Sequence, residues 1–280
     1  MFSGGNYDAY MTEIETPRLR LRPWIGDDFE PLVSMCADPR VMEFSPSIFS
    51  REETEAMWRR IHEHFAHYGF APWAMEVDGK FAGSLGLNWL RFETHFTPCV
   101  EIGYRLRPEF WGRGLATEGG QAALRYGFEC LELREIVAFT VPANKRSRRV
   151  MEKIGLVLSE EFDHPLIAEG HPMRRQVLYR ISRSAWEARP SDKQESMRSD
   201  RFHYTSSTYE SLERALEVHD GHQERVWEQP GPSAGRRCGA HVARVQARFG
   251  RLADGAAGNP GSSQESVPAL SIGHQPGERD

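Results

Sequence analysis

The chain has 280 residues and a formal net charge of −5, with 39% apolar and 27% charged residues, which is enough for one or two domains. It lacks both the roughly 18 consecutive apolar residues of a membrane-spanning helix and the apolar centre of a secretory signal near its start, so we expect a cytoplasmic protein without a membrane partner. Its four cysteines form no C-x-x-C pair and it has no long Lys/Arg run, which argues against a disulfide framework, a cysteine-rich zinc module and a nucleic-acid partner.

The first expected elements are a strand and two helices. Leu19 and Leu21 alternate with arginines, which is the period-two pattern of a half-buried strand. A helix is expected over about 27–37. Ser50 and Glu53 then form a capping box, and apolar residues at helical spacing continue a second helix from there. We expect the apolar stripe of this helix to pack against a sheet.

A β-hairpin is expected next, with strands over 71–77 and 81–89. Its turn is Asp78-Gly79, which supplies the positive backbone dihedrals of a tight antiparallel turn. A strand over 100–106 leads through a glycine-rich turn into a helix from about 114 to 131. The remaining expected elements are a strand over 136–141, a helix over 144–154, and strands near Val157 and over 177–181. This alternation of strands and helices predicts the α/β class.

The sequence divides near Pro190. Residues 12–189 contain all of these elements and are expected to form one domain, with residues 1–11 as an N-terminal extension. From Pro190 onward only 12 of 91 residues are Leu, Ile, Val or Phe, below the fraction of about 20% at which burial offsets chain entropy. We therefore expect 190–280 to be a mostly disordered tail, in which 207–218 has the spacing of a short amphipathic helix.

The turn after residues 100–106 has the composition of an anion-binding site. Gly112, Gly114 and Ala116 keep bulky side chains away from the start of a helix, whose first amide N–H groups have no internal partners. The helix dipole is positive at the same end. A tight strand-to-helix connection without a ligand would also use such glycines, so the turn alone leaves both interpretations open. It matches neither the P-loop nor the Rossmann fingerprint.

Four segments, ordered along the chain, carry a family resemblance. They are Thr16-Pro17-Arg18-Leu19-Arg20-Leu21-Arg22, Glu101-Ile102-Gly103-Tyr104, Trp111-Gly112-Arg113-Gly114-Leu115-Ala116-Thr117-Glu118, and Asn144-Lys145-Arg146-Ser147-Arg148-Arg149-Val150-Met151-Glu152-Lys153-Ile154-Gly155. Over residues 12–187 the chain resembles the GNAT acetyltransferase superfamily, and within it the ribosomal-protein N-terminal acetyltransferases. The resemblance implies an α/β (α+β) GNAT fold, with a central, mixed, strongly twisted sheet flanked by helices.

The resemblance also implies a site for acetyl-CoA. The amides around Arg113 to Ala116 would hold its pyrophosphate, and two splayed parallel strands, 100–106 and 136–141, would receive its pantetheine and thioester. The cofactor contacts expected on this basis are Ile102, Tyr104, Trp111, Gly112, Arg113, Gly114, Leu115, Ala116, Thr117, Asn144, Arg146 and Arg149. Arginines of this set, with Arg148, would neutralise the phosphates, although some could be ordinary solvated surface charges.

Two residues are expected to be catalytic. Glu101 matches the general base of histone acetyltransferases in the same superfamily, and strand alternation could turn it toward the acetyl group; a solvent-facing carboxylate is the alternative. Ser147 matches the serine proposed as the acid for the leaving thiolate in the ribosomal-protein branch, and a local helix cap is its alternative. The tyrosine that many GNAT enzymes use as this acid is replaced here by Met151.

Acceptor contacts and metals are less strongly indicated. Asp163 and His164 lie in a polar, proline-containing loop that could border the acceptor cleft, where they would orient an incoming amine; a turn stiffened by proline is equally consistent with the sequence. His64 and His67 miss the spacing of a zinc helix by one residue. We expect them on an exposed helix face and predict no metal site.

The sequence as a whole predicts an N-acetyltransferase. The expected reaction moves the acetyl group of acetyl-CoA to a primary amine by direct attack, most plausibly to a protein N-terminus. A small-molecule acceptor such as an antibiotic or polyamine is the alternative, and would favour an acidic cleft lined from 43–70 and 160–175. A non-enzymatic acyl-CoA sensor is favoured only if Glu101 and Ser147 face away from the thioester. The protein would act as a monomer or homodimer.

Overall fold

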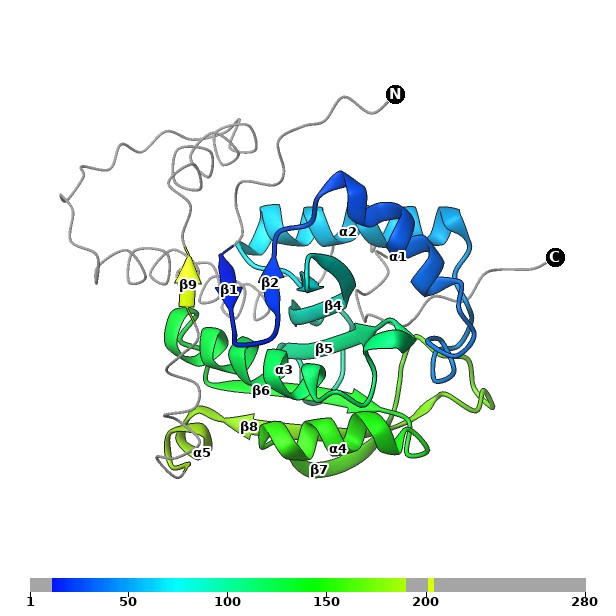
Figure 1. Cartoon of the computed structure of the whole chain (residues 1–280). Coiled ribbons are helices and arrows are strands. Elements are labelled where there is room, and N and C mark those ends of the chain that lie inside the picture. Colours follow the sequence, from blue (N-terminus) through cyan, green and yellow to red (C-terminus); the bar gives the residue numbers. More distant parts are fainter. Residues whose placement is uncertain (1–11, 190–200, 204–280) are drawn as a thin grey trace, which may run out of the picture.

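The computed structural model describes residues 12–189 and 201–203. The expected extension over 1–11 and the expected helix over 207–218 lie outside these residues. Within the described part of the chain nine strands form a single sheet, in the order β7-β8-β6-β5-β4-β3-β2-β1-β9 (Figure 1). All neighbouring strands are antiparallel except β5 and β6, which are parallel. The expected mixed α/β fold is confirmed.

The strands are short at one edge of the sheet and longer at its centre. Their bounds are β1 Glu13–Glu15, β2 Arg20–Arg22, β3 Trp73–Val77, β4 Lys80–Trp89, β5 Val100–Leu106, β6 Glu135–Thr140, β7 Val157–Asp163, β8 Arg175–Ser182 and β9 Arg201–His203. The sequence analysis missed β1, which has one buried apolar residue, Ile14. It also missed β9, which lies inside the expected disordered tail and pairs with β1. Three residues are too few for a period-two pattern to be recognised.

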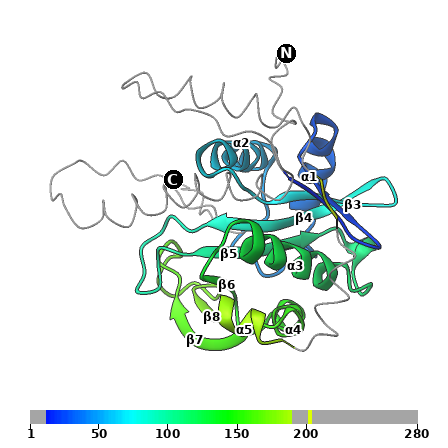
Figure 2. The same cartoon turned by 90° about the vertical axis from the view of Figure 1, so that its left-hand side faces the viewer.

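Helices lie on both faces of the sheet. Their bounds are α1 Phe29–Cys36, α2 Arg51–Tyr68, α3 Leu115–Arg125, α4 Lys145–Ile154 and α5 Arg183–Glu187, and the expected helix over 114–131 ends as one turn of π-helix, Tyr126–Cys130. In both views α1 and α2 lie together above β4 (Figures 1 and 2). The α3 helix packs on β4, β5 and α4. No helix in the described ranges is long and apolar enough to cross a bilayer.

Neighbouring residues of β5 show which helices lie on which face. The hydroxyl of Tyr104 reaches Ser147 on α4, whereas the guanidinium of Arg105 reaches Ser45, in the loop between α1 and α2. Because successive strand residues point to opposite faces, α4 lies on one face of the sheet and the loop that joins α1 to α2 lies on the other. Residues of β5 therefore reach both helical layers.

Local sequence signals explain the ends of α2 and the hairpin. The Ser50 hydroxyl accepts the Glu53 N–H and the Glu53 carboxylate accepts the Ser50 N–H, at 3.2 and 2.7 Å, so the predicted capping box is confirmed. Gly69 ends α2 in the left-handed conformation. Asp78 and Gly79 both have positive φ, as the tight turn between β3 and β4 requires.

His64 is buried within α2, so the expected exposed position is wrong for this residue. It is 0% exposed. Its two ring nitrogens are both hydrogen-bonded: Nδ1 lies 2.7 Å from the Phe70 carbonyl oxygen, and Nε2 accepts the Trp89 N–H at 2.9 Å. Burial lowers the pKa of His64 to about 3. The histidine is therefore neutral and joins α2 to the end of β4, whereas His67 is exposed as expected.

Candidate active site

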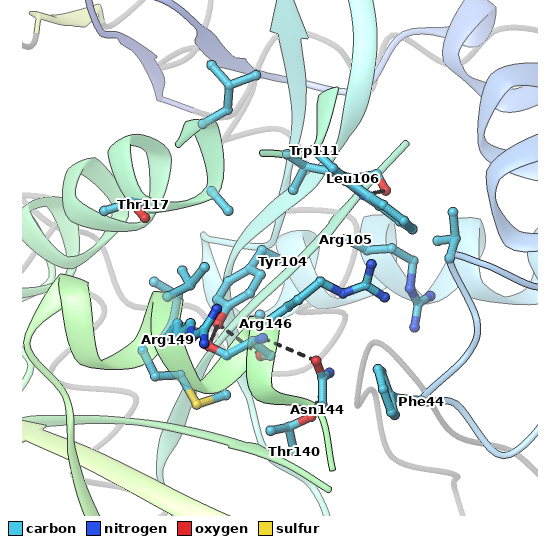
Figure 3. Close-up of a pocket in the computed structure, with 18 of the residues that line it drawn as sticks. Phe44, Tyr104, Arg105, Leu106, Trp111, Thr117, Thr140, Asn144, Arg146 and Arg149 are labelled. Carbon is cyan, nitrogen blue, oxygen red and sulfur yellow. Dashed lines mark hydrogen bonds between the residues drawn. The ribbon is translucent and has the colours of Figure 1, made fainter. Parts of the chain in front are cut away.

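The parallel strands β5 and β6 separate soon after they begin. They pair only at Val100 with Ile136 and at Glu101 with Val137. Beyond these pairs the strands diverge and border a cavity of about 430 Å³. Figure 3 shows Thr117 and Arg149 at one end of this cavity and Phe44 at the other. The expected splay of 100–106 and 136–141 is therefore present.

The glycine-rich turn forms the end of the cavity near Thr117. Gly112 and Gly114 have φ values of 72° and 78°, and Gly114 is the N-cap of α3. Only glycine adopts this conformation at little cost. The Thr117 and Glu118 N–H groups donate to the Gly114 carbonyl, which leaves the preceding amides at the helix start without helical acceptors. The turn can therefore bind an anion through main-chain N–H groups.

The segment before β2 holds this turn in place. The Arg18 guanidinium donates from Nε to a Glu118 carboxylate oxygen at 2.5 Å and from Nη1 to the Arg113 carbonyl oxygen at 2.8 Å. Glu118 also accepts the Thr16 hydroxyl at 2.6 Å and the Arg18 N–H at 2.9 Å. The first of the four motif segments thus contacts the third, although about 100 residues separate them.

Trp111 and Arg146 both line the cavity and contact each other. The Trp111 indole N–H donates to the Leu106 carbonyl at 2.8 Å, which fixes the ring at the end of β5. The Arg146 guanidinium stacks 4.6 Å from the centre of that ring and pairs with Glu43 at 2.6 Å. Both members of the ion pair are more than half exposed, so the pair contributes little stability.

Basic side chains are distributed unevenly around the end of the cavity near Thr117. Arg149 and Lys153 of α4 line the cavity. Arg113 is not among the lining residues, since its guanidinium lies over the Phe110 ring and 3.9 Å from Asp78; only its backbone belongs to the turn. Arg148 donates instead to the Tyr179 hydroxyl at 3.0 Å. Of the four arginines considered from the sequence, two therefore face the cavity, Arg146 and Arg149.

Glu101 lies in the cavity wall where β5 and β6 begin to separate. Its side chain is only 6% exposed, so the solvent-facing alternative is wrong. Burial raises the pKa of Glu101 from 4.5 to about 8, because the charged carboxylate loses its hydration. The carboxylate of Glu101 is therefore a stronger base than an ordinary one, and it becomes the major form only above about pH 8.

Ser147 and Asn144 line the same cavity at the start of α4. The Asn144 side chain caps this helix by accepting the Ser147 N–H at 3.1 Å, and it donates to the Thr140 hydroxyl at 3.0 Å. Asn144, and not Ser147, is thus the helix cap. The Ser147 hydroxyl lies 3.0 Å from the Tyr104 hydroxyl. Met151 also lines the cavity, so no phenol stands where many GNAT enzymes place their acid.

The structure does not bring Asp163 and His164 to the cavity. Asp163 is exposed at the end of β7 and pairs with Arg175 at 3.2 Å. His164 is 0% exposed and packs against Phe92 and Phe139, with ring centres 4.6 and 5.7 Å apart. Burial, together with the charge of Arg174, lowers the pKa of His164 to about 4. The expectation that His164 meets an incoming amine is wrong, because the aromatic cluster encloses its ring.

Sequence reasoning missed most residues at the other end of the cavity. They come from the loop between α1 and α2, from β5 and β6, and from β8: Arg40, Val41, Phe44, Ser45, Arg105, Phe139 and Gln176. Arg105 is only 8% exposed and donates to the Ser45 hydroxyl. Phe44 and Ser45 fall within 43–70, which was expected to line the cleft for a small-molecule acceptor. The other residues belong to no motif, and the sequence offered no signal for them.

A glycine turn that can bind an anion, a cavity between diverging strands and a buried carboxyl group in the cavity wall are together the arrangement expected of an acyltransferase. The family profile described as "Acetyltransferase (GNAT) domain" matches residues 18–157. The chain belongs to this family, whose members transfer an acetyl group from acetyl-CoA to an amine.

Three further similarities describe its relatives. The chain is 33% identical over 191 residues to the Aspergillus fumigatus FsC-acetyl coenzyme A-N(2)-transacetylase, covering 62% of this chain and 77% of that protein. It is 28% identical over 155 residues to the Escherichia coli spermidine N(1)-acetyltransferase, covering 54% and 80%. The ribosomal-protein-S5-alanine acetyltransferase structure from Vibrio fischeri has a TM-score of 0.51 at 18% identity, covering 64% and 99%, and shares the fold.

Proposed function

We propose that this enzyme transfers the acetyl group of acetyl-CoA to the α-amino group of a protein N-terminus. One observation carries the proposal: a single cavity is lined by the glycine turn that can bind a pyrophosphate, by the buried Glu101 and by Ser147. These groups are what acyl transfer needs, namely a held donor, a base for the amine and a hydrogen-bond donor for the leaving group. Since Glu101 and Ser147 line the cavity, the arrangement favours an enzyme over an acyl-CoA sensor.

The proposed donor site follows the length of the cavity. The main-chain amides from Arg113 to Ala116 hold the pyrophosphate, and Arg149 adds positive charge beside it. Pantetheine lies between β5 and β6 with the acetyl group near Glu101. The side chains proposed to contact the donor are those of Ile102, Tyr104, Trp111, Leu115, Thr117, Asn144, Arg146 and Arg149, together with the backbone at Gly112, Gly114 and Ala116.

In the proposed reaction the amine nitrogen attacks the thioester carbonyl. The C–N bond forms, the C–S bond breaks, and the electron pair of that bond leaves on sulfur. Glu101 accepts the proton that the amine loses, while the Ser147 hydroxyl donates a hydrogen bond to the departing thiolate. A thiol of pKa about 8.5 is a tolerable leaving group, so this hydrogen bond assists the step without controlling it.

The pKa of Glu101 supports an α-amine over a lysine side chain. A protein α-amino group has a pKa of about 7.7–8.0, close to the value of about 8 for Glu101. Proton transfer between the two is therefore nearly balanced. A lysine ammonium, with a pKa of about 10.4, would have to lose its proton to a weaker base at a cost of about 3 kcal/mol.

The charges at the acceptor end argue against a polycation. Among the described residues that line the cavity, Glu101 is the one carboxyl group, and Arg40 and Arg105 are the basic residues from the loop before α2 and from β5; Arg40 pairs with Asp38. The acidic cleft expected for a polyamine acceptor is absent from these residues. The names of the Aspergillus fumigatus and Escherichia coli relatives nevertheless favour a small-molecule amine as a second candidate acceptor.

Purified full-length protein tests the acceptor. CoA release from acetyl-CoA is followed with peptides that differ in their first residue, with free polyamines and with aminoglycosides, and mass spectrometry locates the acetyl group. We expect kcat/KM for the best peptide to exceed that for any polyamine by at least about tenfold, with acetylation at the α-amine. Preference for a polyamine or aminoglycoside would establish the second candidate, and release with no acceptor would favour a sensor.

Calorimetry of acetyl-CoA binding tests the donor site separately. Gly114→Asp places a side chain at a φ of 78° and a negative charge beside the proposed pyrophosphate, so affinity should fall by at least about tenfold. Gly170→Asp is the matched control, since Gly170 has a φ of 79° and open space around it and does not line the cavity. Equal affinity of the Gly114→Asp variant and the wild type would contradict the proposed donor site.

A further inference from the structure

Tyr104 is the one β5 residue with a hydrogen bond to the candidate acid. Its hydroxyl donates to the Ser147 carbonyl oxygen at 2.8 Å and lies 3.0 Å from the Ser147 hydroxyl oxygen. Figure 3 shows Tyr104 and Asn144 among the side chains that line the cavity. Both hydroxyl groups belong to cavity-lining residues, so the contact lies within the proposed active site.

The phenol keeps its proton at every pH at which the enzyme can work. Burial raises the pKa of Tyr104 well above its ordinary value of 10. The Tyr104 hydroxyl can therefore act as a hydrogen-bond donor throughout, but it cannot readily give up its proton. A role as the acid itself, like that of the tyrosine on α4 in other GNAT enzymes, is unfavourable for it.

The hydrogens of the two hydroxyl groups allow two arrangements. In the first, Tyr104 donates to the Ser147 carbonyl and the Ser147 hydroxyl donates to the phenol oxygen. In the second, Tyr104 donates to the Ser147 hydroxyl oxygen, which leaves the serine hydrogen free to point into the cavity. Both arrangements fit the positions of the oxygen atoms, because the Tyr104 hydroxyl oxygen lies 2.8 Å from the Ser147 carbonyl oxygen and 3.0 Å from the Ser147 hydroxyl oxygen. Rotation of two hydroxyl hydrogens converts one arrangement into the other.

We propose that Tyr104 is the positioning residue for Ser147, fixing the serine rotamer and donating to its oxygen while that serine donates to the leaving thiolate. This inference rests on the proposed function. As the C–S bond breaks, the negative charge on sulfur favours the second arrangement, in which a chain of two hydrogen bonds runs from Tyr104 through Ser147 to sulfur. Such chains polarise each other and strengthen. Tyr104 keeps its proton, and the amine proton goes to Glu101.

A purely structural role makes a different prediction. If the phenol served only to attach α4 to the sheet, any comparable attachment of α4 would matter equally. Tyr179 of β8 provides one, because its hydroxyl donates to Glu152 at 3.1 Å and accepts from Arg148 at 3.0 Å, both on α4. Tyr179 does not line the cavity. Tyr179→Phe is therefore the matched control for Tyr104→Phe.

A double-mutant cycle on the full-length enzyme tests the proposal. The kcat and the acetyl-CoA Kd are measured for Tyr104→Phe, Ser147→Ala, the double variant, Ser147→Thr with and without Tyr104→Phe, and Tyr179→Phe. We expect Tyr104→Phe to lower kcat about three- to tenfold, the size of one hydrogen bond, with Kd within about twofold of the wild type because the ring that contacts the donor is retained. Adding Tyr104→Phe to the Ser147→Ala variant should not lower kcat further. Adding it to the Ser147→Thr variant, which keeps a hydroxyl group, should again lower kcat.

Several results would overturn the proposal. They are an unchanged kcat for Tyr104→Phe, an equal loss of kcat in the Ser147→Ala background, an increase of Kd that matches the loss of kcat, or an equal loss of kcat for Tyr179→Phe. An unchanged kcat for Ser147→Ala would also overturn it, while leaving acetyl transfer by the wild type intact. Absence of turnover in the wild type with every amine would instead remove the proposed function, and this inference with it.

Discussion

Glu101 shows how its surroundings change the chemistry of a single residue. The same side chain on a solvated strand would be ionised at all pH values above about 5. In the wall of the cavity it is 6% exposed, and burial raises its pKa to about 8. Its carboxylate, the form that can act as a base, therefore becomes the major form only above that pH.

Glu101→Gln should change the pH profile of turnover. With saturating peptide, the kcat of the wild type should rise as pH increases from 6 through about 8 and level off about one pH unit above that value, because the carboxylate forms over that range. The Gln variant should lose at least about 100-fold in kcat at pH 8 and lack this rise. Titration of the peptide amine affects kcat/KM of both variants and so serves as the internal control. Equal turnover of the two would remove Glu101 from the mechanism.

Asp163 and His164 illustrate the opposite case at this scale. Their residue types suit contact with an amine, yet one is paired on the surface and the other is enclosed by Phe92 and Phe139. Residue type states what a side chain can do, whereas the surroundings decide whether it meets a ligand.

At the scale of elements, the start of α3 depends on the segment before β2. The carbonyl of residue 113 and the N–H of residue 114 point in opposite directions, because the peptide bond is trans and planar. By holding the Arg113 carbonyl at 2.8 Å, Arg18 fixes the direction of the Gly114 N–H. The first motif segment thus orients the amides of the proposed pyrophosphate site.

Arg18→Ala should therefore weaken acetyl-CoA binding. We expect the Kd measured by calorimetry to rise about three- to tenfold, as for the loss of one or two hydrogen bonds from a charged group. Arg20→Ala is the matched control, since Arg20 pairs with Glu13 and Glu76, away from the turn. Equal affinities of the two variants would show that the turn keeps its conformation without Arg18.

The contact between α2 and β4 through His64 has a pH dependence of its own. The pKa of His64 is about 3 in the folded protein and near 6.5 in the unfolded chain. Between these values the unfolded state binds more protons, so the stabilisation is fully present above about 6.5 and is lost as pH falls toward 3. The folded protein should therefore become less stable on acidification.

His64→Gln should reduce this dependence. We expect the variant to be about 1–3 kcal/mol less stable at pH 7, because buried hydrogen bonds are impaired, and to lose less further stability between pH 7 and 4.5 than the wild type. Urea unfolding of the wild type and the variant at both pH values gives the slope, which is the change in unfolding free energy between pH 7 and 4.5. His67→Gln, at an exposed position on the same helix, should retain the wild-type slope; a His64→Gln slope identical to it would refute the assignment.

On the scale of the whole molecule, the sheet extends beyond the part that forms the cavity. The residues that line the cavity lie between Arg40 and Gln176, and the family match spans 18–157. The β9 strand joins the far edge of the sheet by pairing with β1. In the described structure, the residues that line the cavity therefore do not include β1 or β9 at this edge of the sheet.

A chain ending at residue 203 should bind acetyl-CoA and turn over a peptide as the full-length chain does, because every described cavity residue is retained. A chain ending at 189 loses β9 and leaves β1 as the edge strand, so its Tm should be slightly lower while Kd is unchanged. Thermal unfolding and calorimetry compare the three chains. Loss of turnover in the chain ending at 203 would assign an acceptor role to residues beyond it.

Much of the fold could be predicted because its signals are local. The capping box at Ser50, the Asp78-Gly79 turn and the apolar periodicities act within a few residues, where backbone preferences decide the structure. The glycine turn was found from its own residues, whereas Ser147 was singled out through the resemblance of its segment to the family. The three-residue strands β1 and β9 were missed because their formation depends on pairing with distant segments.

By itself the sequence determined the order of the longer elements, the glycine-rich turn and the resemblance to the family, because each depends on residue types at short spacing. Only the tertiary structure decided the pKa of Glu101, the partner of Ser147, the enclosure of His164 and the arginines near Phe44. These properties depend on burial and on contacts between residues tens of positions apart, and the free energy of a charge or a hydrogen bond is set by that environment.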